Sequence, residues 1–163
     1  MGARNGGGPE GCGAKMEMEG KLVYEFFSIG MQLPVFVHEV TEEEIDNFCK
    51  SLQEKNPIYM SDEAAKKLGL AGRIAPPMLV RKYAHFQNVF KGFKGTIPGH
   101  TIYASGEYHF LNPVRPGDTI TTTGRVIDKF VKRNKKFLCF ELISKNQSGQ
   151  TVVINRHTSV WPK

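Results

Sequence analysis

The stretch EKNPIYMSDEAAKKLGLAGRIAPPMLVRKYAHFQNVF, from Glu54 to Phe90, decides the fold of this chain. Its proline pair, Pro76-Pro77, permits a helix to start, because a proline at the first helical position loses no hydrogen bond. From about Met78 to Phe90 four apolar side chains fall on one helical face, Leu79, Tyr83, Phe86 and Phe90. That face needs an apolar partner, and the chain beyond Gly99 has the alternation typical of strands. We therefore expect a single α+β domain in which one long central helix is wrapped by a curved antiparallel sheet.

Two shorter helices are predicted before the long one. Thr41, with Glu44 three positions later, has the pattern of a capping box, so a helix should run from Glu42 to about Gln53. Asn56-Pro57 ends this helix, because the residue before a proline is pushed out of the helical region. A second short helix is expected from Glu63 to Leu68.

Apolar and polar residues alternate in segments that predict five strands. In the segment from Ile102 to Phe110, the even-numbered side chains should face the core, while Ser105, Glu107 and His109 face outward. The RPGD sequence at residues 115–118 predicts a turn. The predicted strands are Pro34–Glu39, Ile102–Phe110, Thr119–Ile127, Phe137–Ser144 and Thr151–Trp161.

The length of 163 residues fits one domain. Residues 1–20 hold seven glycines and few residues able to pack, so we expect a disordered extension followed by one domain over residues 21–163. No apolar run reaches the roughly 20 residues of a membrane span, and no membrane partner is expected. Three scattered cysteines suit a reducing compartment, which favours the cytoplasm.

The net charge of +6 is spread along the chain, with one dense basic cluster. On a hairpin such a cluster is either a solvated turn or a site for a phosphate-bearing partner. Nucleic acid is not expected, because no recognised binding motif accompanies the charge. The cysteines lack the spacing of metal ligands, so no metal site is expected. The cluster consists of Lys129, Lys132, Arg133, Lys135 and Lys136.

Four motifs follow one another in a characteristic order: EKNPIY, DEAAKKLGL, GRIAPPML and LNPVRPGDTI. Together they resemble the MaoC-like hydratases and dehydratases of the hotdog fold, over about residues 36–161. The most similar branch is the MaoC dehydratase N-terminal, or fatty-acid-synthase-type dehydratase, domain. The resemblance implies syn addition of water to a trans-2-enoyl thioester, as in an (R)-specific enoyl-CoA hydratase, or the reverse dehydration of a 3-hydroxyacyl thioester. It implies coenzyme A or an acyl carrier as part of the substrate, and no separate cofactor.

In the catalytic members of that family, a turn with the pattern G-D-x-N-P-x-H supplies the Asp and His that handle the proton of water. The matching positions here are Glu54 for the Asp, Asn56 unchanged, and Tyr59 for the His. Tyr59 is the main departure, since a phenol with a pKa of about 10 is a weak base at neutral pH. Pro76-Pro77 replaces the family's H-G, so only the N–H of Met78 remains to polarise the thioester carbonyl.

Two hypotheses follow from this resemblance. In the first, the chain is catalytic with an altered set, in which Glu54 is the base, Tyr59 is the acid and Asn56 orients the substrate. In the second, which we favour because both parts of the machinery have changed, the chain is the substrate-binding half of a two-subunit hydratase. Either version implies a homodimer or a heterodimer with a second hotdog subunit. The expected substrate-binding residues are Arg73, Pro77, Met78, Tyr83 and His109, and the expected coenzyme A phosphate ligands are Lys132, Arg133 and Lys135.

Simpler structural roles compete with several of these assignments. Asn56 can cap its own turn, Tyr59 can be a partly buried ring, and Arg73 can pair with an acidic neighbour. His85 falls off the apolar face of the long helix, so we expect it at the surface or in an interface. A hotdog thioesterase is disfavoured, because residues 78–90 contain no Asp or Glu. A non-catalytic acyl-CoA or acyl-carrier binding or regulatory protein stays open, because the family histidine is missing.

Overall fold

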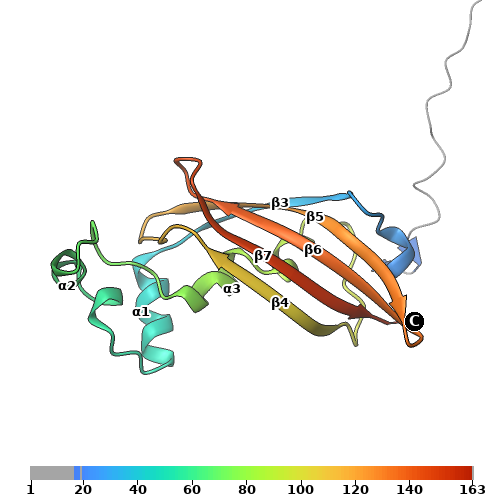
Figure 1. Ribbon diagram of the computed structural model, residues 1–163, viewed down its shortest axis with the longest axis horizontal. Helices are drawn as coiled ribbons and strands as arrows, with labels where there is room; N and C mark the ends of the chain where they lie inside the picture. Colours follow the sequence, from blue (N-terminus) through green and yellow to red (C-terminus); the bar gives the residue numbers. More distant parts are fainter. Residues whose placement is uncertain (1–16, 19, 163) are drawn as a thin grey trace, which may run out of the picture.

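The protein is built around one antiparallel sheet with the strand order β3-β5-β6-β7-β4 (Figure 1). The computed structural model describes residues 17–18 and 20–162. All five predicted strands are confirmed, and β5 and β6 extend beyond their predicted ends into a long hairpin. The strands are β3 (Gln32–Glu39), β4 (Ile102–Phe110), β5 (Thr119–Lys132), β6 (Lys135–Lys145) and β7 (Thr151–Trp161).

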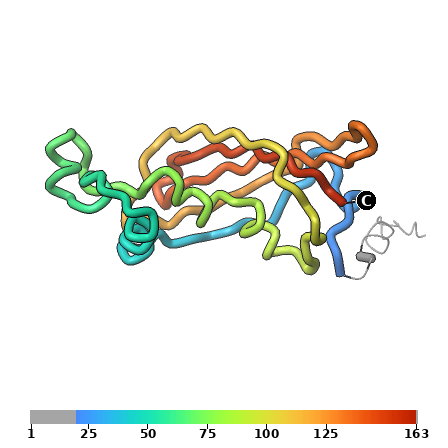
Figure 2. Tube along the Cα trace, turned by 90° about the horizontal axis from the view of Figure 1, so that it is seen from below, coloured from blue at the N-terminus to red at the C-terminus, as the bar shows by residue number. Residues whose placement is uncertain are grey.

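Short helical segments lie on one face and at one end of this sheet. α1 and α2 lie at the end of the sheet in Figure 1, and the segment that contains α3 and α4 runs along one face of the sheet in Figure 2. The helices are α1 (Glu42–Ser51), α2 (Asp62–Lys67), α3 (Val80–Tyr83) and α4 (Phe86–Phe90), and the 3-10 turns are η1 (Tyr24–Phe26), η2 (Pro57–Tyr59) and η3 (Pro77–Leu79).

The start of the described chain packs against its end. Strands β1 (Glu17–Met18) and β2 (Lys21–Leu22) form a small hairpin of their own. The indole Nε1 of Trp161, in β7, donates a hydrogen bond to the carbonyl oxygen of Leu22 at 2.8 Å. Most of the predicted disordered extension, residues 1–16 and 19, lies outside the described residues.

The predicted helix of residues 78–90 is interrupted, which corrects our expectation of one long rod. Side chains of the sheet bind the backbone at the interruption. Thr122 Oγ1 donates to the carbonyl oxygen of Tyr83 at 2.8 Å. Asn155 Nδ2 donates to the carbonyl oxygen of Ala84 at 2.8 Å. These carbonyls end α3 and are satisfied without a further helical turn, so the chain can change direction before α4.

The interruption also changes the surroundings of His85. This residue is extended, with φ −103° and ψ 137°, and only 6% of its surface is exposed. Our prediction of a surface or interface position for His85 is therefore wrong, because it assumed unbroken helical geometry. The predicted apolar face is nevertheless confirmed, since all four of its side chains are buried: Leu79, Tyr83, Phe86 and Phe90.

Strand β4 forms one edge of the sheet and is exposed along almost all of its length. A bulge between Tyr103 and Ser105 shifts the alternation, so that Tyr103 shares the inner face with Gly106. The predicted inward position is therefore wrong for Ile102, which is 59% exposed. On the inner face of β4, Tyr108 packs against the aliphatic part of the core, and Tyr103 lies against the ring of His157.

The core has two parts on the helical side of the sheet. One is rich in aromatic side chains, with Phe27, Phe90, Phe140 and Trp161 packed mainly edge to face. The other is mainly aliphatic and joins α1, α3 and the ends of β5 and β7. Together they anchor the segment from η3 to α4 on the sheet, which fixes the position of the loop that leads to Pro76-Pro77.

Two predicted local motifs are present. Thr41 Oγ1 accepts a hydrogen bond from the backbone N–H of Glu44 at 3.1 Å, so Thr41 caps α1. In the RPGD turn, Asp118 Oδ2 accepts a hydrogen bond from the N–H of Arg115 at 2.7 Å, and Gly117 has a φ of +82°. Within the described residues, no helix has the length and apolar character needed to cross a membrane.

Candidate functional site

The Asn56-Pro57 turn lies beside a small apolar cleft. The N–H of Ile74 donates to the carbonyl oxygen of Ile58 at 3.2 Å, which joins the turn to the loop before the proline pair. This loop forms one wall of a cleft of about 180 Å³, and the start of the segment after β4 forms the other. The lining residues are Ile74, Ala75, Pro77, Tyr83, Phe110, Leu111, Asn112, Pro113 and Val114. The predicted substrate-binding residues Pro77 and Tyr83 are thus brought together in one opening.

The polar side chains of the turn bind the turn's own backbone. Glu54 Oε1 accepts hydrogen bonds from the N–H groups of Lys55 at 2.8 Å and Asn56 at 2.9 Å. Asn56 Oδ1 accepts from the N–H of Ile58 at 3.2 Å and so caps η2. In this geometry Glu54 and Asn56 stabilise the turn, and their catalytic assignments stay predictions.

Tyr59 occupies the position of the family histidine. Its ring is half-buried and packs against the aliphatic part of the core. Burial raises the pKa of the Tyr59 phenol above its ordinary value, and the negative charge of Glu54 raises it further. The shift favours the protonated hydroxyl, which can donate a hydrogen bond and is a weak base at neutral pH.

Met78 and Arg73 flank the cleft in different ways. Met78 lies in the first turn of η3, where helix geometry leaves its N–H without an intrahelical acceptor, and its side chain is 59% exposed. Arg73 is instead held by acidic groups. Its Nη1 lies 2.8 Å from Asp46 Oδ1, and its Nη2 lies 3.5 Å from Glu42 Oε2. The guanidinium thus has the structural ion pair that we considered as its alternative role.

The remaining predicted residues lie away from the cleft. His109 faces outward from β4, and its Nε2 lies 2.8 Å from Glu107 Oε1. Lys132, Arg133 and Lys135 lie at the tip of the β5–β6 hairpin, at the opposite end of the molecule from α1 and α2 (Figure 1). Within one chain the structure does not bring these residues together with the Asn56-Pro57 turn.

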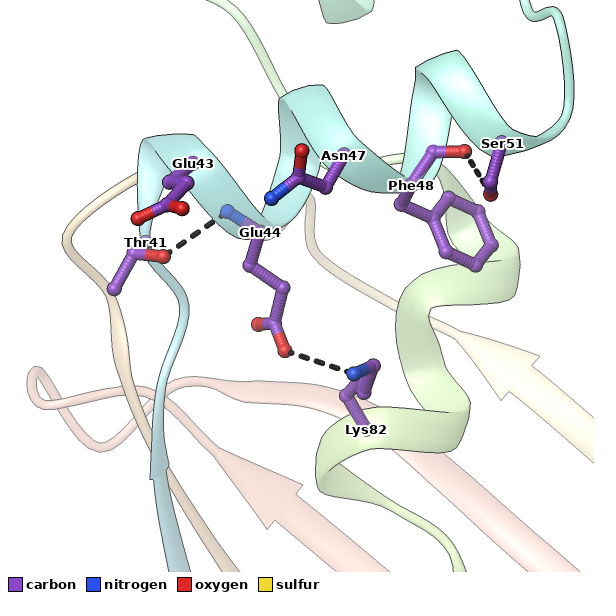
Figure 3. A pocket seen from close by; sticks show the side chains of 7 residues that line it. All are labelled: Thr41, Glu43, Glu44, Asn47, Phe48, Ser51 and Lys82. Atoms are coloured by element: carbon purple, nitrogen blue, oxygen red, sulfur yellow. Dashed lines mark hydrogen bonds and ion pairs between the residues drawn. The ribbon is translucent and has the colours of Figure 1, made fainter.

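A second pocket, of about 450 Å³, lies between α1 and α3 (Figure 3). Its central group is the Glu44 carboxylate, which points toward Lys82 with Oε1 3.6 Å from Nζ. Glu44 Oε2 also lies 2.8 Å from His38 Nε2. The capping-box prediction gave the Glu44 side chain the task of accepting a hydrogen bond from the N–H of Thr41. That part of the prediction is wrong, because the Glu44 carboxylate instead joins α1 to His38 in β3 and to Lys82 in α3. The Glu44 carboxylate and the Lys82 ammonium compensate each other, and His38 lies within hydrogen-bond distance of the same carboxylate, so we assign the cluster to the docking of α1.

Sequence reasoning also missed a buried pair of histidines beneath α4. The ring centroids of His85 and His157 lie 6.0 Å apart, and 1% of His157 is exposed. Burial lowers the pKa of His85 to about 4, with the positive charge of Arg81 acting in the same direction. Burial also lowers the pKa of His157 to about 4, helped by His85 and Arg81. No local pattern signals this pair, because the helix interruption turns His85 inward.

No metal site is evident in the described part of the chain, where no three His, Cys, Asp or Glu side chains gather closely enough to hold an ion. Cys49 is buried and Cys139 is half-buried, and both are free thiols. Burial raises the pKa of each thiol, so neither is an activated nucleophile. The apolar cleft and its turn are thus the strongest candidate site.

The five-stranded antiparallel sheet around a central helical segment, with an Asn-Pro turn at an apolar cleft, defines a MaoC-like hotdog domain of the hydratase and dehydratase type. A family model confirms this class. The chain belongs to the family described as FAS1-like, dehydratase domain region, whose model matches residues 28–155.

Two curated relatives illustrate the sequence similarity. A UPF0336 protein of Streptomyces avermitilis is 31% identical over 101 residues, and the alignment covers 57% of this chain. That alignment spans 64% of the relative's own length, slightly under two thirds. A mitochondrial 3-hydroxyacyl-[acyl-carrier-protein] dehydratase of Arabidopsis thaliana is 27% identical over 123 residues, covering 75% of this chain and 70% of the relative.

Solved structures show the same fold. A monoamine oxidase regulatory protein from Archaeoglobus fulgius superposes with a TM-score of 0.76 and 26% identity, covering 88% of this chain and 95% of the other. The C-terminally truncated HadBC complex of Mycobacterium tuberculosis, a (3R)-hydroxyacyl-ACP dehydratase, has a TM-score of 0.71 and 20% identity, covering 81% and 96%. The recognised family and the hotdog fold are thereby confirmed, while the individual site residues stay predictions.

Proposed function

We propose that this chain is the substrate-binding subunit of an (R)-specific enoyl-thioester hydratase, or 3-hydroxyacyl thioester dehydratase, whose catalytic turn is supplied by a partner hotdog subunit. The observation that carries the proposal is Tyr59, a phenol with a raised pKa at the position of the family's base. Glu54 and Asn56 support it, since their side-chain oxygens already accept hydrogen bonds from their own turn. Hydration requires a group that removes a proton from water, and in this turn the phenol of Tyr59 stands where the family has its histidine.

The groups that remain can bind and orient a thioester. The cleft between Pro77 and Phe110 offers apolar walls to the acyl chain. We assign the N–H of Met78, which has no intrahelical acceptor, to donate a hydrogen bond to the thioester carbonyl, which would stabilise the negative charge that develops there. Tyr59 can add a second donor. These roles suit a subunit that holds the substrate while another chain moves the proton.

The edge strand β4 is the surface through which we place the partner. Among the described strands it lies at the edge of the sheet with one neighbour, β7, and its aromatic side chains Tyr103 and Phe110 are 51% and 49% exposed. An exposed edge with apolar side chains is a ready template for an added strand. The HadBC complex, a (3R)-hydroxyacyl-ACP dehydratase of the same fold, supports a pair of unlike hotdog chains here. The free thiols of Cys49 and Cys139 support a reducing compartment such as the cytoplasm.

A hydration assay distinguishes the two-subunit proposal from the hypothesis that this chain is catalytic with the altered residues Glu54, Asn56 and Tyr59. Short and medium trans-2-enoyl-CoAs would be offered to the purified chain alone, and then with a second hotdog chain that carries G-D-x-N-P-x-H. We expect little activity alone and strong activity in the mixture. Full activity alone, abolished by Tyr59→Phe but not by the distant control Tyr24→Phe, would instead establish the altered catalytic set.

A gain of function provides the complementary test. The double variant Glu54→Asp/Tyr59→His restores the two family residues in the turn. If the cleft is a thioester site, this variant should hydrate enoyl-CoA without a partner, at a rate clearly above that of the unchanged chain. If neither this variant nor the mixture is active but enoyl-CoA still binds, the chain is the acyl-thioester binding or regulatory protein that forms the second candidate.

A further inference from the structure

A groove of about 540 Å³ lies on the outer face of the sheet, at the base of the β5–β6 hairpin. In β6 the side chain of Leu138 is buried in the core, so by alternation Phe137 points outward. In β5 a bulge between Val126 and Asp128 shifts the alternation and brings Phe130 to the outer face beside Phe137. The groove therefore opens on the face of the sheet opposite the core, away from the apolar cleft.

The floor of the groove belongs to an apolar strip that crosses four strands. At about 4.8 Å between neighbouring strands, the strip is about 14 Å long. Phe130 and Phe137 are half-buried, and their rings are stacked with centroids 4.9 Å apart and planes inclined by 7°. At the other end of the strip, Ile102 is 59% exposed. The residues of the strip, each the cross-strand partner of the next, are Phe130, Phe137, Val160 and Ile102.

Three cations border the apolar strip on the side of the hairpin turn, and we call them the basic rim. Lys132 and Lys135 face each other across β5 and β6, and Arg133 lies in the turn between them. All three line the groove. Within the part of the chain that the structure describes, none of their side chains forms a hydrogen bond or an ion pair. The basic rim thus holds three positive charges that no described group compensates.

The other charges near the groove are already engaged. Lys129 Nζ donates to the carbonyl oxygen of Phe27 at 2.7 Å, and Lys136 Nζ lies 2.6 Å from Glu25 Oε1. Asp128 faces the groove side of β5, and its Oδ1 accepts a hydrogen bond from the N–H of Lys129 at 2.7 Å. This carboxylate lies across the apolar strip from the basic rim, at about 13 Å along the strand, where salt screens most of its effect.

The basic rim is an unfavourable arrangement for the chain without a ligand. Like charges directly opposite each other on neighbouring strands destabilise a sheet, as Lys132 and Lys135 do here. Arg133 has a φ of +50°, a conformation that Asn, Asp and Gly adopt more readily in a two-residue hairpin turn. An anion bound against all three cations would offset the repulsion between them.

Hydroxyl groups lie on the far side of the apolar strip. Ser105 of β4 pairs with Thr158 of β7, and both residues line the groove. Thr158 Oγ1 lies 3.2 Å from the Sγ of Cys139. A hydroxyl can both donate and accept a hydrogen bond, which suits the mixed donors and acceptors on the edge of a nucleobase. The groove thus offers, in order, cations, a flat apolar surface and hydrogen-bonding groups.

We propose that this groove binds a short single-stranded nucleic acid, with its phosphates against the basic rim and about two or three bases against the apolar strip. Such strands are bound by a combination of cations that contact the backbone and flat side chains that contact the bases. The sequence has no recognised nucleic-acid motif, because the strip is assembled from four strands that meet only in the folded protein. This activity goes beyond the proposed hydratase role and does not depend on it.

Other polyanions fit the groove less well. A membrane surface would require an apolar hairpin tip, but the tip is the polar pair Arg133-Asn134, and the exposed Val131 points to the other side of the hairpin. In a duplex the bases are stacked inside and cannot reach the apolar strip. The proposal also gives the basic rim a different anion from the coenzyme A phosphates that the family resemblance implies, in keeping with its position away from the cleft.

Fluorescence anisotropy of the full chain with a labelled strand of about ten nucleotides tests the basic rim. Loss of the three cations should weaken binding by about tenfold or more, and should lower the slope of log Kd against log salt by about 2, since each phosphate contact contributes about 0.7. An equal loss of charge on α1 and α2, at the other end of the molecule, should leave both unchanged (Figure 1). The rim variant is Lys132→Gln/Arg133→Asn/Lys135→Gln, and the matched control is Lys50→Gln/Lys66→Gln/Lys67→Gln.

RNA and DNA strands of the same mixed sequence distinguish the two sources of this chemistry. Binding of either strand, with loss in the rim variant, supports the proposal. A preference for RNA would indicate that a hydroxyl of Ser105 or Thr158 contacts the 2′-hydroxyl of the ribose.

The apolar strip needs its own variant. Phe137→Leu should weaken binding by about fivefold or more without changing the salt slope, because it removes a stacking surface but no charge. Val37→Ala, on the exposed strand β3 at the opposite edge of the sheet from β4, should keep the full affinity. Far-UV circular dichroism and Trp161 fluorescence in urea verify folding, and Phe130→Leu replaces Phe137→Leu if the latter is unstable.

The proposal has clear points of failure. Unchanged affinity of the rim variant would overturn it, because the cations would then not contact the strand. Unchanged affinity of the folded phenylalanine variant would also overturn it, in favour of a non-specific polyanion surface. Binding of phosphatidylserine vesicles without binding of either strand would assign the basic rim to a membrane surface instead. A Kd weaker than about 0.1 mM at physiological salt, the weak end of non-specific binding, would reject the groove as a nucleic-acid site.

Discussion

Acidification from pH 7 to pH 5 should destabilise this protein strongly, because His85 and His157 are buried as neutral imidazoles. Burial lowers both pKa values to about 4, against about 6.5 in the unfolded chain. Between these values the unfolded state binds more protons than the folded state, so stability falls as the pH falls. Each histidine should remove about 2 kcal/mol of unfolding free energy between pH 7 and pH 5, and the pair about 4 kcal/mol. Below about pH 4 the histidine contribution levels off.

Urea unfolding followed by Trp161 fluorescence measures this effect, since Trp161 is the only tryptophan and is buried. The variants His85→Gln and His157→Gln should each remove about half of the loss between pH 7 and pH 5, whatever their effect at pH 7. The exposed His100→Gln is the matched control and should keep the full loss. Equal stability of the unchanged protein at both pH values, or an unaltered loss in both buried-site variants, would refute the reasoning.

Two further predictions concern packing and the helix interruption. Gly124→Ala should cost about 1–3 kcal/mol of unfolding free energy, because a Cβ there would collide with the buried Leu142 side chain, and thermal unfolding measures the loss. Thr122→Val should cost about 1–3 kcal/mol, because it removes the hydroxyl that donates to the Tyr83 carbonyl oxygen, whereas the exposed Thr123→Val should change stability by much less. Equal losses for the two threonine variants in urea titrations would contradict this role of Thr122.

The strands and turns of this fold are predictable from the sequence because their signals are local. Alternation within eight to eleven residues is enough to locate a strand, and the RPGD turn contains its own Asp118 acceptor and positive-φ glycine. The interruption after α3 is different. Its donors, Thr122 and Asn155, lie 39 and 71 residues from the carbonyls they bind. No helical pattern in residues 78–90 contains that information, so the buried position of His85 could not be predicted either.

The same distinction applies to the candidate site. The motifs supplied the Asn56-Pro57 turn and the proline pair as candidates, and in the structure the N–H of Ile74 donates to the carbonyl oxygen of Ile58, which joins the turn to the loop before the proline pair. The partner of Arg73 was left open, because Asp46 lies on α1 and approaches only through the tertiary fold. The sequence thus supplied candidate residues for the site, but their side-chain contacts depend on elements that meet only in the folded protein.

The hydrogen bonds of the Asn56-Pro57 turn also help to compare the altered catalytic set with the two-subunit enzyme. Glu54 Oε1 accepts two backbone hydrogen bonds and Asn56 Oδ1 accepts one, which leaves Glu54 Oε2 as the carboxylate oxygen that the altered catalytic set could use. The two-subunit arrangement leaves all three hydrogen bonds in place and requires only that β4 gain a neighbour. Since β4 lies at the edge of the described sheet and is exposed, the second arrangement needs no change in the turn.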